Sequence, residues 1–192
     1  MTVEFDLEPA AAALDAVVAA IPDDRLDAPT PCASTTVRDL LAHVAMLTEA
    51  FRQAATKEAV GRSVPPGNPA EVDLPDEWRT LIPARTAALV AAWRKPDAWE
   101  GDTEAGGVEL PAASMARIAL DELVVHGWDL ARGAGLPFTA ADDHLAILLE
   151  MLADTPAEGT PGMFGPVLTV APDAPALDRV LALTGRDAHW AA

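Results

Sequence analysis

Residues 112–132 read AASMARIALDELVVHGWDLAR and carry the clearest helical pattern in this chain. Apolar residues recur in it every three or four positions, which is the spacing of one face of an α-helix. Proline precedes the stretch at position 111, and glycine follows it at position 133. Because proline suits the first turn of a helix and glycine its end, we expect one helix over about these residues.

The rest of the chain is also rich in alanine, leucine and valine, and it contains no tyrosine. This composition favours helices over strands. The apolar pattern predicts helices at about residues 8–21, 36–59, 76–95, 112–132, 139–153 and 174–183.

The expected fold is therefore all-α. Four long helices with short links predict a four-helix bundle, followed by a short helical or irregular appendage at about residues 139–192, all within a single domain over residues 1–192. Ser34 or Thr35 is expected to cap the second helix. Residues 96–110 contain three glycines, so they form either a short hairpin or an irregular crossover.

The charge balance excludes two classes of partner. Thirteen lysines and arginines against thirty aspartates and glutamates give a formal net charge of −17 at pH 7. Nucleic acid and anionic membrane surfaces would repel such a protein. No uncharged stretch reaches the roughly 18 residues of a membrane-spanning helix, and the acidic N-terminus is unlike a secretory signal. With one cysteine, Cys32, an intramolecular disulfide is not expected either, so the predicted location is the cytoplasm.

Two polar side chains lie on the apolar side of the helix expected at residues 112–132. On a helical wheel with Arg117 at 0°, Asp121 and Arg132 fall within about 60° of it and should face water. Glu122 and His126 fall at about 140° and 180°, among apolar residues. A carboxylate buried there costs several kcal/mol unless it is paired or bound to a cation. Four positions apart, the two side chains could hold one ion together, and a hydrogen bond between them is the alternative.

His43 supplies a third candidate ligand. It lies at the flank of the apolar stripe of the helix expected at residues 36–59, so it should point toward a neighbouring helix. Two imidazoles and one carboxylate suit zinc or a similar divalent metal such as nickel or manganese. Three protein ligands leave a coordination position open, which is typical of catalytic sites. For His43 alone, a hydrogen-bonded core or rim residue is the alternative.

Other polar residues could support this site. Asp39 and Asp129 are candidates for hydrogen bonds to ligand histidines, and ordinary surface acids are the alternative for both. His144 is either a fourth ligand or a packed core residue. Cys32 lies eleven residues before His43. At about 1.5 Å per helical residue this separation is large, so shared coordination with Cys32 is not expected.

Four motifs in this chain resemble a known family. They are Thr-Pro-Cys at 30–32, Val-Arg-Asp-Leu-Leu-Ala-His at 37–43, Asp-Glu-Leu-Val-Val-His-Gly-Trp-Asp-Leu-Ala-Arg at 121–132 and Leu-Thr-Gly-Arg-Asp at 183–187. The chain resembles the DinB-like superfamily, and more closely the actinobacterial metal-binding proteins related to the N-terminal domain of mycothiol-dependent maleylpyruvate isomerase. That resemblance implies a four-helix bundle with a divalent metal, usually zinc, held by His43, Glu122 and His126.

The resemblance also implies a class of chemistry, because the superfamily includes transferases that use mycothiol or bacillithiol. We therefore expect a metal-dependent enzyme of the thiol S-transferase or isomerase type, acting with mycothiol on a small electrophilic substrate. The alternative is a non-catalytic module that binds a metal or small ligand, and a third reading is a metal-free helical scaffold. A homodimer is compatible with Trp128, which falls near the expected wet face. Beyond the metal ligands, the sequence names no catalytic residue.

Overall fold

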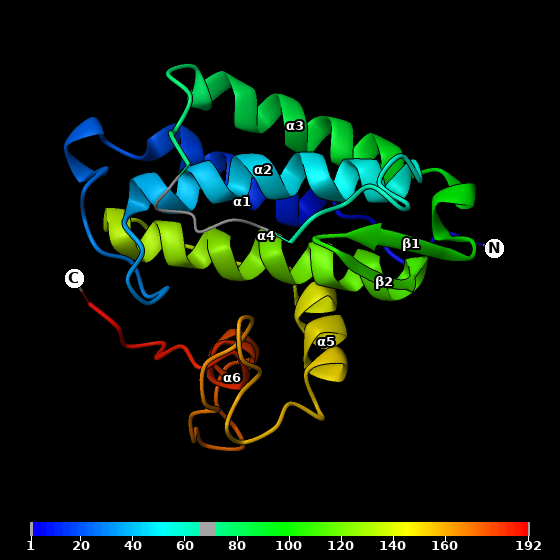
Figure 1. The fold of residues 1–192 in the computed structure, drawn as a ribbon. Coiled ribbons are helices and arrows are strands. Elements are labelled where there is room, and N and C mark those ends of the chain that lie inside the picture. Colours follow the sequence, from blue (N-terminus) through cyan, green and yellow to red (C-terminus); the bar gives the residue numbers. More distant parts are fainter. Residues whose placement is uncertain (1, 66–71, 192) are drawn as a thin grey trace.

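Four long helices lie side by side and bury their apolar faces against one another (Figure 1). The computed structural model describes residues 2–65 and 72–191. Helices α1 and α2 each pack against both α3 and α4. The bounds are α1 (Glu8–Ala20), α2 (Val37–Ala55), α3 (Trp78–Trp93) and α4 (Ala112–Ala134). The long helices thus lie where the sequence predicts them, to within a few residues at each end.

The ends of α2 show why helix limits are hard to predict. Thr36 caps the helix, not Ser34 or Thr35 as expected, because its hydroxyl accepts a hydrogen bond from the Asp39 backbone N–H at 3.2 Å. The Asp39 carboxylate accepts one in return from the Thr36 backbone N–H at 3.0 Å. This reciprocal pair is a capping box. At the other end Lys57 has a positive φ of 63°, so the helix stops short of residue 59.

The expectation of a purely helical fold is wrong between α3 and α4. A 3₁₀ turn, η3 (Pro96–Trp99), is followed there by strands β1 (Asp102–Ala105) and β2 (Val108–Pro111). They form an antiparallel hairpin in which Thr103 pairs with Leu110. Gly106 and Gly107 have φ values of 59° and 77°, which the two central positions of a tight hairpin turn require. The hairpin alternative for residues 96–110 is therefore the observed one.

The C-terminal part of the chain covers the side of α4 that was expected to face water. Helices α5 (Asp142–Met151) and α6 (Ala176–Leu183) pack against each other, and α5 also contacts α4 (Figure 1). The Arg132 guanidinium donates to the backbone carbonyls of Ala188 and Trp190, at 3.2 and 2.8 Å. Asp121 is consequently only 5% exposed and Trp128 only 4%. The prediction that this arc of α4 is solvated is wrong, because the wheel treats the helix without its neighbours.

Among the described residues, none of the helices combines the length and the hydropathy that crossing a membrane would need.

Gly133 allows a loop to approach α4 closely. A Cβ atom at this position would lie 2.9 Å from the Pro29 carbonyl oxygen and 2.9 Å from Val37 Cγ2. Such distances are too short for real contacts, and a backbone carbonyl gives way less easily than a side-chain end. The loop that carries Cys32 can therefore reach α4 only where the helix has no side chain.

We predict that Gly133→Ala destabilises the protein by about 1–3 kcal/mol, because overpacking against the backbone outweighs the roughly 1 kcal/mol that alanine gains in a helix. Gly127→Ala is the matched control. Its Cβ would meet the Phe138 ring at 2.8 Å and can displace that side chain. Urea unfolding measures both variants, and equal stabilities would contradict the proposed role of Gly133.

Candidate metal centre

Three predicted ligands converge between α2 and α4. His43 comes from α2, and Glu122 and His126 come from successive turns of α4. Their potential ligand atoms all lie within 4.8 Å of one another. The two imidazole rings stand edge to face, with centroids 5.2 Å apart. This group has the donor types and the spacing of a divalent-metal site.

One buried atom of this group has no hydrogen bond. His43 Nδ1 has no hydrogen-bond partner within the described part of the chain. Glu122 Oε2 lies 3.0 Å from His126 Nε2, so protonated His126 pairs with it, and neutral His126 leaves it unsatisfied. Buried polar atoms in native proteins are nearly always satisfied, so the free Nδ1 of His43 asks for an explanation. A cation bound by all three side chains would satisfy His43 Nδ1 and replace the proton between Glu122 and His126, so the residues fit a metal.

Asp129 fixes the orientation of the His126 ring. Its Oδ2 accepts a hydrogen bond from His126 Nδ1 at 3.0 Å, and its side chain is completely buried. Since Nδ1 is engaged there, Nε2 is the ring atom that faces Glu122. Metal-bound histidines commonly hold their second nitrogen in this way.

Arg186 completes the surroundings of Asp129. Its Nε donates to both Asp129 oxygens at 3.1 Å, and its Nη2 donates to Oδ2 at 2.9 Å. Arg186 is itself only 9% exposed. Sequence reasoning missed this contact, because residue 186 lies outside the helix that carries the ligands. The one available signal was its place in the Leu-Thr-Gly-Arg-Asp motif.

The charges around His126 favour its protonated form in the metal-free protein. Burial by itself lowers the pKa of His126, but the carboxylates of Glu122 and Asp129 raise it to about 10. Burial likewise raises the pKa of Glu122, yet the His126 charge holds it below its usual value. Burial, and then the His126 charge, lower the pKa of His43. A proton on His126 thus occupies the place between the carboxylates that a metal ion would compete for.

Two other predicted site residues, Asp39 and His144, have contacts outside the metal-ligand group. Asp39 is engaged in the capping box of α2, and no hydrogen bond joins it to His43 among the described residues. His144 is packed, the second of its two alternatives. It is 1% exposed, and its Nε2 lies 2.8 Å from the Asp6 carbonyl oxygen.

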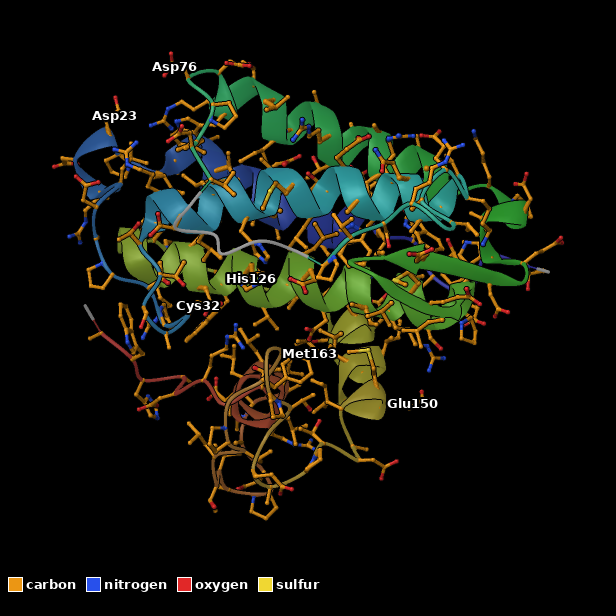
Figure 2. The ribbon with its side chains drawn as sticks, viewed as in Figure 1. Asp23, Cys32, Asp76, His126, Glu150 and Met163 are labelled. Atoms are coloured by element: carbon orange, nitrogen blue, oxygen red, sulfur yellow. The ribbon has the colours of Figure 1, made fainter. Side chains whose placement is uncertain are left out.

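Cys32 lies closer to the site than expected. Its sulfur forms a second group with His126 and Asp129 in which all potential ligand atoms are within 4.8 Å of one another. Figure 2 labels Cys32 on the loop next to the part of α4 that carries His126. Among the described residues, Cys32 and His43 belong to different groups of potential ligands, in line with their separation along the chain, and His126 is common to both groups. The loop before α2 folds back onto α4, where Gly133 admits it.

A narrow apolar pocket opens beside Glu122. It has room for about one water molecule, roughly 10 Å³. Its walls come from Leu14, Val44, Leu47, Thr48, Phe51, Leu89, Ala119 and Leu123. The pocket thus gives the Glu122 side chain one apolar neighbour surface, opposite in character to the two histidines that its carboxylate meets.

Comparisons with known structures agree with this fold. A crystal structure of the mycothiol-dependent maleylpyruvate isomerase matches with a TM-score of 0.61 at 22% identity. A histidine-to-alanine mutant of that isomerase matches with a TM-score of 0.59 at 19% identity. Each match covers 76% of this chain and 66% of the isomerase chain, which is just under two thirds. No curated protein sequence matches significantly.

The sequence itself matches a family model, described as the mycothiol maleylpyruvate isomerase N-terminal domain, over residues 7–131. This range contains His43, Glu122, His126 and Asp129, and it ends well before Arg186. Because the match covers about two thirds of the chain, this protein belongs to the family of the mycothiol maleylpyruvate isomerase N-terminal domain, the DinB-like group that its motifs indicated.

Proposed function

We propose that this protein binds a divalent metal through His43, Glu122 and His126 and uses it with a low-molecular-weight thiol, such as mycothiol, on a small electrophilic substrate. The observation that carries the proposal is the convergence of these side chains, with the buried His43 Nδ1 left without a hydrogen bond. The family match and the two solved isomerases support the thiol part.

The ligand set favours zinc, with nickel and manganese as other candidates, because imidazole and carboxylate donors suit all three. Three protein ligands leave one coordination position for water or a thiol. A divalent ion there would lower the pKa of a bound water to about 7 or keep a bound thiol deprotonated. Either S-transfer or isomerisation could follow from such a thiolate.

The chain's own residues have separate roles in this proposal. Glu122 supplies one negative charge, so the site keeps a net positive charge that attracts an anionic sulfur. Asp129 holds the Nδ1 proton of His126 and thereby directs the Nε2 lone pair at the ion.

The first prediction concerns the ligands. His126→Ala should lose most of the bound metal, because it removes one of three donors and leaves the Glu122 carboxylate without its partner. Native mass spectrometry and elemental analysis of the purified protein report the metal content per chain. His144→Ala is the matched control, since it removes a buried histidine from a different place and should retain the metal. Unchanged metal content in His126→Ala would refute the ligand assignment.

The second prediction concerns pH. Metal must displace the proton that His126 holds with a pKa of about 10 in the metal-free protein. Glu122 is already ionised and His43 already neutral above pH 7, because both pKa values are lowered. The apparent affinity should therefore rise about tenfold per pH unit from pH 7 to 9, with one proton released.

Competition with a zinc chelator across this range measures the slope, and calorimetry in two buffers counts the released protons. An affinity that levels off above pH 7 would show that His126 titrates like an ordinary histidine, near 6.5.

The third prediction concerns the thiol. Cobalt-substituted protein should develop a strong near-ultraviolet charge-transfer band when mycothiol is added, because a thiolate bound to cobalt absorbs there. Mycothiol with a methylated sulfur is the control and should give no band. If the metal binds normally but mycothiol does not change the spectrum, the thiol-dependent function fails and the non-catalytic metal-binding module takes its place.

A further inference from the structure

We propose that Arg186 is a positioning residue of the metal centre, which locks Asp129 and through it the ring of His126. This inference rests on the proposed function above and deepens it. It assigns to the C-terminal segment, beyond the family domain at residues 7–131, a part in building the site.

All three nitrogens of the Arg186 guanidinium form hydrogen bonds within the protein. Its Nε and Nη2 hold both oxygens of Asp129, and its Nη1 donates to the Thr184 carbonyl at 3.1 Å. With all three nitrogens bonded and the side chain buried, Arg186 offers no free edge to a substrate. Its geometry suits holding a carboxylate in one orientation, since the planar fork of arginine matches carboxylate geometry.

The end of α6 determines where Arg186 points. The Gly185 N–H donates to the Ala182 carbonyl at 3.1 Å, and the Arg186 N–H donates to the Leu181 carbonyl at 2.8 Å. Gly185 has a φ of 79°. These features make a Schellman motif, which ends the helix and turns the chain sharply. Arg186 is the first residue after that turn. The local geometry of the helix end therefore directs its side chain toward α4.

Asp129 passes this constraint on to His126. One of its oxygens, Oδ2, accepts from Arg186 Nη2 and from His126 Nδ1 at 2.9 and 3.0 Å. Without Arg186 the carboxylate would be held by the histidine alone and could rotate. Buried ion pairs add little net stability, so orientation is the larger effect to expect from this one. Partners of metal-bound histidines typically change metal affinity 10–100-fold when removed.

A second metal ion at Cys32, His126 and Asp129 is the competing interpretation, because their ligand atoms also lie within 4.8 Å of one another. Arg186 argues against it. The guanidinium already places a positive charge about 3 Å from both Asp129 oxygens, and it would repel a second cation. Both Asp129 oxygens already accept hydrogen bonds, Oδ1 from Arg186 and Oδ2 from Arg186 and His126.

The test compares two arginines that hold the same C-terminal tail to α4. Arg186→Ala should weaken zinc binding 10–100-fold in chelator competition. Arg186→Lys should restore part of the loss, because lysine keeps the charge without the fork. Arg132→Ala is the matched control. It releases the tail at Ala188 and Trp190 without touching Asp129, so zinc affinity should stay at the wild-type value.

A second measurement does not depend on metal. Nitrogen-15 NMR of the histidine rings in the metal-free protein should show the His126 Nδ1–H as a slowly exchanging, low-field signal. We expect this signal to persist in Arg132→Ala, to broaden in Arg186→Lys and to disappear in Arg186→Ala. If Arg186→Ala does not fold, Arg186→Gln takes its place in both measurements.

Three results would overturn the inference: wild-type affinity and ring signals in the Arg186 variants, an equal loss of affinity in Arg132→Ala, or two zinc ions per wild-type chain. Failure of the proposed function is a different outcome. In that case wild-type protein binds no zinc at all, and the NMR comparison still decides whether Arg186 positions His126.

Discussion

Charged groups buried along one helix are the constraint on which the rest of this structure depends. Within two turns, α4 places Glu122, His126 and Asp129 among apolar neighbours, together with the buried Asp121. A buried charge is costly unless a counter-charge or hydrogen bonds meet it. The elements around α4 supply Arg186 to Asp129 and place His43 beside Glu122 and His126, whereas Asp121 Oδ1 has no hydrogen-bond partner among the described residues.

His126 connects two sides of the site that different parts of the chain build. Its Nε2 faces Glu122, and the ring stands against His43 from α2. Its Nδ1 faces Asp129, which Arg186 holds from the segment after α6. The side toward α2 has the unpaired His43 Nδ1 and the Glu122 carboxylate, which suit a cation, and the side toward α6 already contains a cation in the Arg186 guanidinium. The His126 ring therefore lies between Glu122 and His43, which can bind a metal, and Asp129, whose charge Arg186 already neutralises.

Local rules predicted much of this arrangement. The pair Glu122 and His126 was found because a four-residue spacing on an apolar helix face is visible in sequence alone. The glycine pair at 106–107 allowed a hairpin, although the sequence could not choose it over a crossover. The cap of α2 was misplaced by one or two residues, since Ser34, Thr35 and Thr36 all have hydroxyls. Only the capping box with Asp39 distinguishes Thr36.

The sequence by itself determined the positions of the helices and the residues that could bind a metal, because helical periodicity and residue chemistry are properties of neighbouring positions. The tertiary structure decided what covers each helix face. Asp121 and Trp128 are buried because the C-terminal segment packs on them, and Cys32 reaches His126 because Gly133 leaves space for its loop. Arg186 contacts Asp129 although the two residues are 57 positions apart in the chain. Such contacts depend on how the loops fold back onto α4, and the periodic patterns of the sequence do not predict the path of a loop.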